Sequence, residues 1–274
     1  MAEVEIIQIM LYIQVATVIG CLVYSAIVDL IKREISDIPW IIMAIEGVIT
    51  TIVIIVVANN SVFYTRRQVG ILVAINLFVG LIMGYLLYYT GVMGGADAKA
   101  LMALSINSSV YPFLIGVTQL EIYRFMPSIF NTFFNWLLTM VIIYPLPLLG
   151  YNIYLKVRGG NLFEGTNANF ASKFLMMVSG YLIPIERARN RNDIVYSEVF
   201  NENEEQWEIK HFMQVQEIEE EEEFKKEVEE KIKETSRKKI WVKVLPPGIA
   251  FLLIGYIINL VAGNILFLIY HFAL

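Results

Sequence analysis

The sequence predicts an all-α polytopic membrane protein with about six transmembrane helices and a charged cytoplasmic insert before the last helix. Two observations support this fold class. Hydrophobic residues make up 57% of the 274-residue chain and charged residues only 17%, whereas soluble domains carry about 25% charged residues. In addition, uncharged runs long enough to cross a hydrocarbon core recur along the chain.

Five runs reach the length of a membrane-spanning helix, which needs about 20 apolar residues. In chain order they are Ile6–Val28, Ile38–Ala58, Val69–Ala96, Phe125–Leu155 and Val244–Phe272. A sixth run, Ala100–Leu120, is uncharged but contains the polar stretch SINSSV, which predicts a short or broken helix. We therefore expect five transmembrane helices in residues 1–155 and the sixth in residues 244–274.

Basic residues predict the orientation, because Lys and Arg accumulate on the cytoplasmic side of membrane proteins. Lys32 and Arg33 follow the first run, Lys99 follows the third, and most other basic residues lie within residues 156–243. The prediction is a multi-pass protein of the cell membrane with both termini outside. Residues 156–243 then form the cytoplasmic insert.

The insert has two parts with different composition. Residues 169–190 are apolar and then basic, which leaves two alternatives: a segment along the membrane surface with its arginines at lipid head groups, or the core of a small domain. Residues 217–239 are highly charged and predict a solvated helix with Glu-to-Lys pairs at four-residue spacing. This helix is either an acidic surface that attracts a basic substrate segment or a helix without a partner.

Two of the four aspartates, Asp29 and Asp97, stand at the ends of apolar runs on the predicted cytoplasmic side. An ionisable group beside such a run is costly to bury, so a function is expected. Two close carboxylates hold one shared proton. One then takes a proton from water while the other donates to a carbonyl oxygen, which hydrolyses an amide without a covalent intermediate.

Small residues surround the second aspartate. Residues 94–96, which read Gly-Gly-Ala, leave room for a helix or a peptide backbone beside Asp97. Gly80 and Gly84 have the G-x-x-x-G spacing that predicts tight helix packing. Two structural alternatives stay open: Asp29 as an ordinary residue at a helix end, and Asp97 as the N-cap of the next helix.

These stretches resemble the paired motifs of the type IV prepilin peptidase family, most closely its archaeal preflagellin peptidase branch. The family comprises membrane aspartic proteases of the Gly-x-Gly-Asp class. Its first motif consists of an aspartate, a basic pair and then Ile-Pro-Asp or Ile-Pro-Asn. The residues of this chain that match it are Asp29, Lys32, Arg33, Ile35, Ser36 and Asp37. Its second motif, Gly-x-Gly-Asp-x-Lys, is matched by Gly94, Gly95, Ala96, Asp97, Ala98 and Lys99. Ser36 replaces the usual proline and Ala96 the second glycine.

The resemblance implies a membrane-embedded aspartic endopeptidase that removes the short basic leader from preflagellin or type IV prepilin-like precursors at the cytoplasmic membrane boundary. It implies Asp29 and Asp97 as the catalytic pair. The supporting residues that it implies are Gly94, Gly95, Ala96 and Lys99. No metal or organic cofactor is expected. The expected partners are the precursor proteins and the lipid bilayer, without nucleic acid. The choice between flagellin and pilin precursors and the oligomeric state stay open.

Glu46, midway along the second run, suggests a rival function. An intramembrane carboxylate is a functional hypothesis by default, and Glu46 with the two aspartates would serve an ion- or proton-coupled transporter. Alternatively, Glu46 is protonated and hydrogen-bonded to a neighbouring helix, which is the interpretation we favour. A third reading of the whole chain is a non-catalytic assembly factor of the same fold.

Overall fold

The computed structural model of the chain describes residues 2–32, 34–58, 65–90, 93–110, 127–189, 191, 194–210, 218–235, 237–244, 246–266 and 269. The chain divides into two compact units. The first comprises Met1–Thr139 and Pro247–Leu274, and the second comprises Met140–Pro246.

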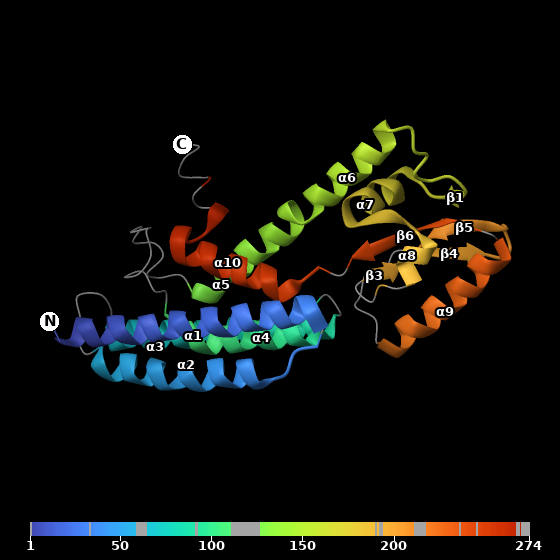
Figure 1. Cartoon of the computed structure of the whole chain (residues 1–274). Helices are drawn as coiled ribbons and strands as arrows, with labels where there is room; N and C mark the ends of the chain where they lie inside the picture. The colour runs from blue at the N-terminus through green and yellow to red at the C-terminus, as the bar shows by residue number, and fades with distance from the viewer. Residues whose placement is uncertain are drawn as a thin grey trace. The chain divides into compact units, whose positions relative to one another are not determined.

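The described part of the first unit is helical. Its helices are α1 (Ala2–Lys32), α2 (Ile38–Val57), α3 (Arg66–Tyr89), α4 (Gly95–Asn107), α5 (Ser128–Leu138) and α10 (Gly248–Ala262). Figure 1 shows that the C-terminal end of α1 and the N-terminal ends of α4 and α10 lie at the same end of this unit. Three segments that are far apart in sequence therefore meet at one end of the bundle.

Four helical segments are long and apolar enough to cross a membrane. They are α1, α2, α3 and the segment Ser128–Val157. The helices in the other two predicted runs are shorter, with 13 residues in α4 and 15 in α10. Residues 111–120 of one run and 270–272 of the other lie outside the described residues, so the six spans stay a prediction.

The predicted run Val69–Ala96 is not one helix, which corrects the sequence-based boundary. Helix α3 ends at Tyr89, where the Thr90 hydroxyl donates to the carbonyl oxygen of Leu86 at 2.8 Å. Helix α4 starts at Gly95, after an extended Gly94. Apolarity alone does not reveal such a break, because the residues on both sides of it are uncharged.

The long apolar segment Ser128–Val157 changes geometry in its middle. After α5, a π-helical turn spans Thr139–Ile143, and α6 then runs over Pro145–Val157. Proline lacks the backbone N–H that a regular helix would use at this point, and its fixed φ suits the first position of a new turn. The boundary between the two compact units coincides with the start of this turn.

Close helix packing in the first unit depends on glycine. An added Cβ at Gly80 would lie 2.5 Å from Ser105 Oγ, and one at Gly84 would lie 2.7 Å from Met102 Cγ. The structure thus confirms that the G-x-x-x-G pair forms a tight packing face on α3, and α4 is the helix that packs there.

Buried polar side chains connect the helices of this unit. Asn76 of α3 donates to the Ser105 carbonyl oxygen at 2.7 Å and accepts from the Ile129 backbone N–H at 3.0 Å. Asn259 of α10 donates to Ser128 Oγ at 3.0 Å. Buried polar groups in an apolar environment are costly without partners. The polar residues of the SINSSV stretch are therefore interior residues and not part of an exposed loop.

The second unit mixes helices with strands, so the all-α prediction is wrong for the insert. After α6 it contains β1 (Thr166–Asn167), α7 (Phe170–Ser179), β2 (Gly180–Pro184), α8 (Ile185–Arg189), β3 (Ile194–Tyr196), β4 (Glu198–Asn201), β5 (Gln206–Ile209), α9 (Ile218–Thr235) and β6 (Lys239–Val244). One sheet has the order β1-β5-β4 and the other, fully antiparallel, the order β2-β6-β3. Strands of two to six residues are too short for an alternating pattern to stand out.

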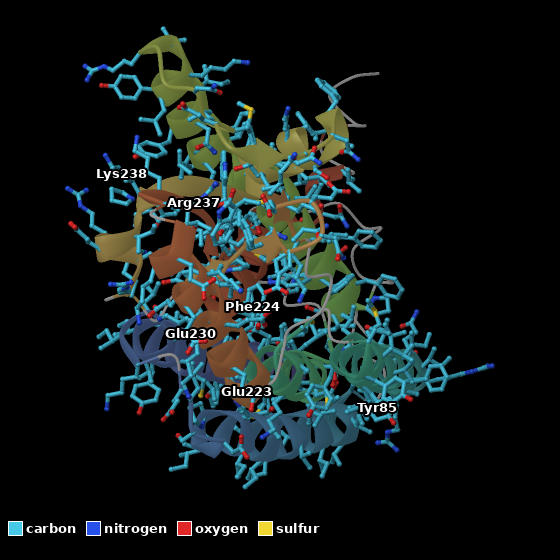
Figure 2. All side chains as sticks on the ribbon, turned by 90° about the vertical axis from the view of Figure 1, so that its right-hand side faces the viewer. Tyr85, Glu223, Phe224, Glu230, Arg237 and Lys238 are labelled. Carbon is cyan, nitrogen blue, oxygen red and sulfur yellow. The ribbon has the colours of Figure 1, made fainter. Side chains whose placement is uncertain are left out.

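Helix α9 packs on the core of the second unit. Its buried face consists of Phe224, Val228 and Ile232. Glu223 and Glu230, labelled with Phe224 in Figure 2, are exposed. The highly charged segment is therefore an amphipathic helix whose acidic side faces outward.

A buried ion pair connects the two sheets of this unit. Glu198 of β4 is fully buried, and its Oε1 lies 2.6 Å from Nη2 of Arg237. Its other oxygen accepts from the backbone N–H of Trp241 at 3.0 Å. Since both carboxylate oxygens have partners, the burial of this charge is compensated.

Candidate active site

Asp29 and Asp97 occupy helix ends at the same end of the first unit. Asp29 lies in the last turn of α1, and Asp97 is the third residue of α4. Both side chains are partly buried. Because the C-terminal end of α1 and the N-terminal end of α4 lie at one end of the bundle (Figure 1), the two helix turns that carry Asp29 and Asp97 lie at the same end of this unit.

The local structure around Asp97 differs from the capping alternative. Gly94, and not Asp97, is the N-cap residue of α4. Asp97 stands in the first turn, where a carboxylate is favoured by the positive end of the helix dipole. Asp97 is therefore not the N-cap residue itself, but its place in the first turn agrees with the part of the alternative that rests on the helix dipole.

The start of α10 lies against the Asp97 carboxyl group. An added Cβ at Gly248 would lie 2.5 Å from Oδ1 and 2.6 Å from Cγ of Asp97, so no larger residue fits there without moving the carboxyl group. Trp136 of α5 donates from Nε1 to the Gly248 carbonyl oxygen at 3.2 Å. Gly248 is thus held from one side by Trp136 while its Cα faces Asp97.

Sequence reasoning missed Gly248. The available signal was the sequence Pro-Pro-Gly that opens the last apolar run. Two prolines mark a break before the helix, and a following glycine is a candidate for close approach. Nothing in the sequence indicates that the neighbouring group is Asp97, because 151 positions along the chain separate the two residues.

Lys99 connects the two aspartate motifs. Its Nζ lies 2.7 Å from Oδ1 and 3.0 Å from Oδ2 of Asp37. Asp37 is the N-cap of α2 but makes no side-chain cap hydrogen bond. The pair ties the first turn of α4 to the start of α2, at side-chain exposures of 54% and 56%. The sequence left the role of Lys99 open, and the structure gives it this partner.

The small residues before Asp97 are not packed tightly. Added Cβ atoms at Gly94 and Gly95 would meet only ordinary contacts, at 3.7 Å from Asp97 Oδ2 and 3.6 Å from Tyr88 Cε2. Ala96 is partly buried. The close helix approach to Asp97 therefore depends on Gly248 and not on these residues. Arg33, the second basic residue of the first motif, lies outside the described residues.

Glu46 lies away from the aspartates. It is about 12 Å along α2 from the first residue of that helix. Its Oε2 accepts a hydrogen bond from the Asn107 amide of α4, where α2 and α4 pack so closely that a Cβ at Gly47 would lie 2.8 Å from the Asn107 backbone nitrogen. This contact supports the interpretation of Glu46 as a residue that joins two helices.

Among the residues that the structure describes, no three His, Cys, Asp or Glu side chains are grouped so that they could hold an ion.

Comparison with known proteins gives a consistent result. The sequence model of the type IV leader peptidase family matches residues 16–148, which include both aspartates, and that of the archaeal peptidase A24 C-terminus, type II, matches residues 172–265. The chain is 29% identical over 178 residues to a preflagellin peptidase of Methanococcus voltae, covering 64% of this chain and 69% of that protein. It is 22% identical over 176 residues to a preflagellin peptidase of Methanococcus maripaludis (strain C6), covering 64% and 70%.

Proposed function

Because this chain belongs to the type IV leader peptidase family, we propose that it removes the short basic leader from preflagellin or type IV prepilin-like precursors, with Asp29 and Asp97 as the catalytic pair. The chain is a peptidase of the membrane. One observation supports the catalytic assignment: Asp29 and Asp97 lie at helix ends, at the same end of the bundle. Both also lie inside the region that the family model matches.

The chemistry follows from two carboxyl groups and one water molecule. The ionised carboxylate takes a proton from the water molecule as the water oxygen attacks the peptide carbonyl carbon. The protonated partner carboxyl group donates its proton to the carbonyl oxygen. Collapse of the resulting gem-diol breaks the C–N bond. The amine leaves with the proton that the first carboxyl group acquired, and one hydroxyl group of the diol returns a proton to the partner carboxylate. Atoms and protons balance without a covalent intermediate.

The surrounding helices would position the reacting groups. Gly248 limits where the Asp97 carboxyl group can lie, and the Lys99–Asp37 pair holds the start of α4 against the start of α2. The uncrowded Gly94 and Gly95 leave room for the extended backbone of a substrate.

The membrane topology proposed for this reaction has six spans with both termini outside. Residues 1–155 carry five of them and the aspartate motifs, residues 156–243 form the cytoplasmic insert, and residues 244–274 hold the last span. The distribution of basic residues supports this orientation. Cleavage would then take place at the cytoplasmic membrane boundary, where water reaches the aspartates.

The substrate would bind in two environments. Its hydrophobic helix would lie beside the helices of the enzyme, and its basic leader would lie near the exposed carboxylates of α9, including Glu223 and Glu230. The names of the two relatives support a preflagellin over a prepilin.

The test is processing of a preflagellin from the same cell in native membranes between pH 5 and 8, with the mass of the product identifying the cleaved bond. Wild-type protein should release the leader, and Asp29→Asn and Asp97→Asn should not. Asp37→Asn is the comparison variant, because this exposed aspartate pairs with Lys99 but lies outside the proposed catalytic pair, so it should lower cleavage only several-fold. Cleavage unchanged in both variants of the pair would remove the aspartic mechanism.

A further inference from the structure

Helix α7 exposes a continuous apolar face. Phe170, Phe174 and Leu175 are 86%, 54% and 49% exposed, and Ala171 and Val178 lie on the same side by helical spacing. An exposed apolar strip on a folded helix indicates a surface that binds something apolar. This strip is independent of the proposed catalytic residues.

The opposite face of α7 is part of the core. Met176 is fully buried and packs with Leu162 and Trp241. The helix begins with Asn169, whose side chain accepts from the Ser172 backbone N–H at 2.8 Å. Helix α7 is therefore an amphipathic helix that packs on the core with one face, and its opposite, apolar face is exposed in the described structure.

A hydrogen-bonded asparagine fixes the level of α7 along the membrane-spanning segment. The buried Asn152 of α6 donates to the carbonyl oxygens of Met177 at 2.9 Å and Gly180 at 2.7 Å. Asn152 is five residues from the end of the 30-residue apolar segment Ser128–Val157. The end of α7 therefore lies beside the last turns of this apolar segment, where a membrane-spanning helix passes from the hydrocarbon core into the head groups.

Exposed aromatic residues mark the same level. Tyr151 and Tyr154 of α6 are 47% and 49% exposed, and tyrosine is enriched at membrane–water interfaces. The basic Lys156 and Arg158 follow at the end of the helix. This sequence of aromatic and then basic side chains is typical of a helix that emerges into anionic head groups.

A basic cavity of about 700 Å³ opens beside this part of α6. Tyr151 and Leu155 are among its lining residues, and Arg187, Lys238 and Lys239 contribute positive charge. Glu164 also lines the cavity, so its basic residues outnumber a single carboxylate. Among the described residues these three cations have no carboxylate within ion-pair distance, whereas Arg237 in the same wall is paired with Glu198. Figure 2 labels Arg237 and Lys238, which directly precede β6 in the chain. An apolar wall beside unpaired cations suits the phosphate group of a lipid.

We propose that α7 lies in the membrane interface, with its apolar face towards the acyl chains, and that the basic cavity holds the phosphate head group of an anionic lipid. The bilayer is the occupant because the exposed face of α7 is joined by Asn152 to a helix that itself leaves the bilayer at this level. The insert is thereby anchored to the membrane surface. This proposal does not depend on the identity of the catalytic residues.

The test for α7 is the depth of a nitroxide label in the full-length protein reconstituted in vesicles. In a Cys21→Ser background, Phe174→Cys is labelled on α7 and Glu227→Cys, an exposed position of α9, serves as the matched control. The expected result is a several-fold higher ratio of oxygen to water-soluble nickel-chelate collisions at position 174 than at position 227. Equal ratios, or exclusion of both reagents from position 174, would overturn membrane binding.

The head-group assignment has its own measurement. A label at Asn161→Cys, on an exposed residue that lines the cavity, should lose mobility when phosphatidylglycerol is added to phosphatidylcholine vesicles. The loss should disappear in the Lys238→Glu/Lys239→Glu variant, and inorganic phosphate in phosphatidylcholine vesicles should not reproduce it. An effect of inorganic phosphate alone, or no effect of phosphatidylglycerol, would contradict a lipid head group in this cavity.

Discussion

The carboxyl group of Asp97 has a close neighbour that limits its position. Gly248 lets the start of α10 contact this carboxyl group, and the space for a Cβ atom is already filled by Asp97 itself. In contrast, Gly94 and Gly95 could carry a Cβ without a clash. At the residue scale, the geometry of the proposed active site therefore depends on a glycine outside the two aspartate motifs.

The variant Gly248→Ala is expected to lower kcat/KM for precursor cleavage by about 100-fold, because a shift of about 1 Å in a reacting group costs this much. The loss should appear mainly in kcat, since the substrate-binding helices are unchanged. Cleavage kinetics in detergent or vesicles measure the effect.

Two glycine variants serve as controls for that result. Gly150→Ala should leave cleavage unchanged, because its added Cβ meets nothing within 4 Å. Gly180→Ala, in the second unit, should lower the melting temperature, because its Cβ would lie 3.2 Å from the Val242 carbonyl carbon, yet a folded fraction should keep its kcat. Wild-type activity in Gly248→Ala would show that this glycine does not position Asp97.

The sequence predicts Asp29 and Asp97 as the catalytic pair, because charged groups beside apolar runs stand out in a chain with four aspartates. It left the role of Lys99 open and missed Gly248. Both depend on contacts between distant segments, 62 residues apart for Lys99 and Asp37. A single sequence does not reveal which distant segments meet.

At the scale of helices and strands, single side-chain contacts connect elements that the sequence shows only as separate runs. The Lys99–Asp37 pair connects α4 to α2, and the buried Glu198–Arg237 pair connects β4 to the start of β6. The two pairs differ in solvent exposure, so their expected contributions to stability differ as well.

Reversal of Lys99 to Asp should reduce cleavage several-fold with little loss of stability. Both partners are half-exposed, and exposed ion pairs contribute about 0.2–1 kcal/mol. The double variant Asp37→Lys/Lys99→Asp should restore most of the activity, because the attraction returns with the charges exchanged. Cleavage rates of the two single variants and the double variant measure this. No recovery in the double variant would show that the pair does not set the position of α4.

The variant Glu198→Gln should destabilise the insert by about 3–5 kcal/mol, because it leaves the buried Arg237 guanidinium without its counter-charge. Trp207 and Trp241 lie in this unit, so their fluorescence during urea denaturation reports its unfolding. Glu202→Gln is the matched control, because Glu202 also contacts a basic residue but is 71% exposed. An unchanged urea midpoint in Glu198→Gln would contradict the structural role of the pair.

At the scale of the whole molecule, the sequence predicted the long apolar helices and a distinct charged insert between the last two runs. Helices α1 to α3 follow from runs of at least 20 residues, in which apolarity and length leave few other structures. The two small sheets of the insert were missed, because their strands are short and lie between helical segments. The break before α4 was predicted a few residues too late in the chain, because uncharged residues continue from α3 through it to Ala96.

The central claim is that Asp29 and Asp97 act together as one dyad on a preflagellin substrate. The most direct measurement is kcat/KM for leader cleavage by wild-type protein, Asp29→Asn, Asp97→Asn and the double variant, all reconstituted in the same lipid. Each single variant should lose at least about 10²–10⁴-fold. The double variant should be no worse than either, because groups that act as a unit are not additive. Wild-type rates in either single variant, or losses that multiply in the double variant, would contradict the dyad.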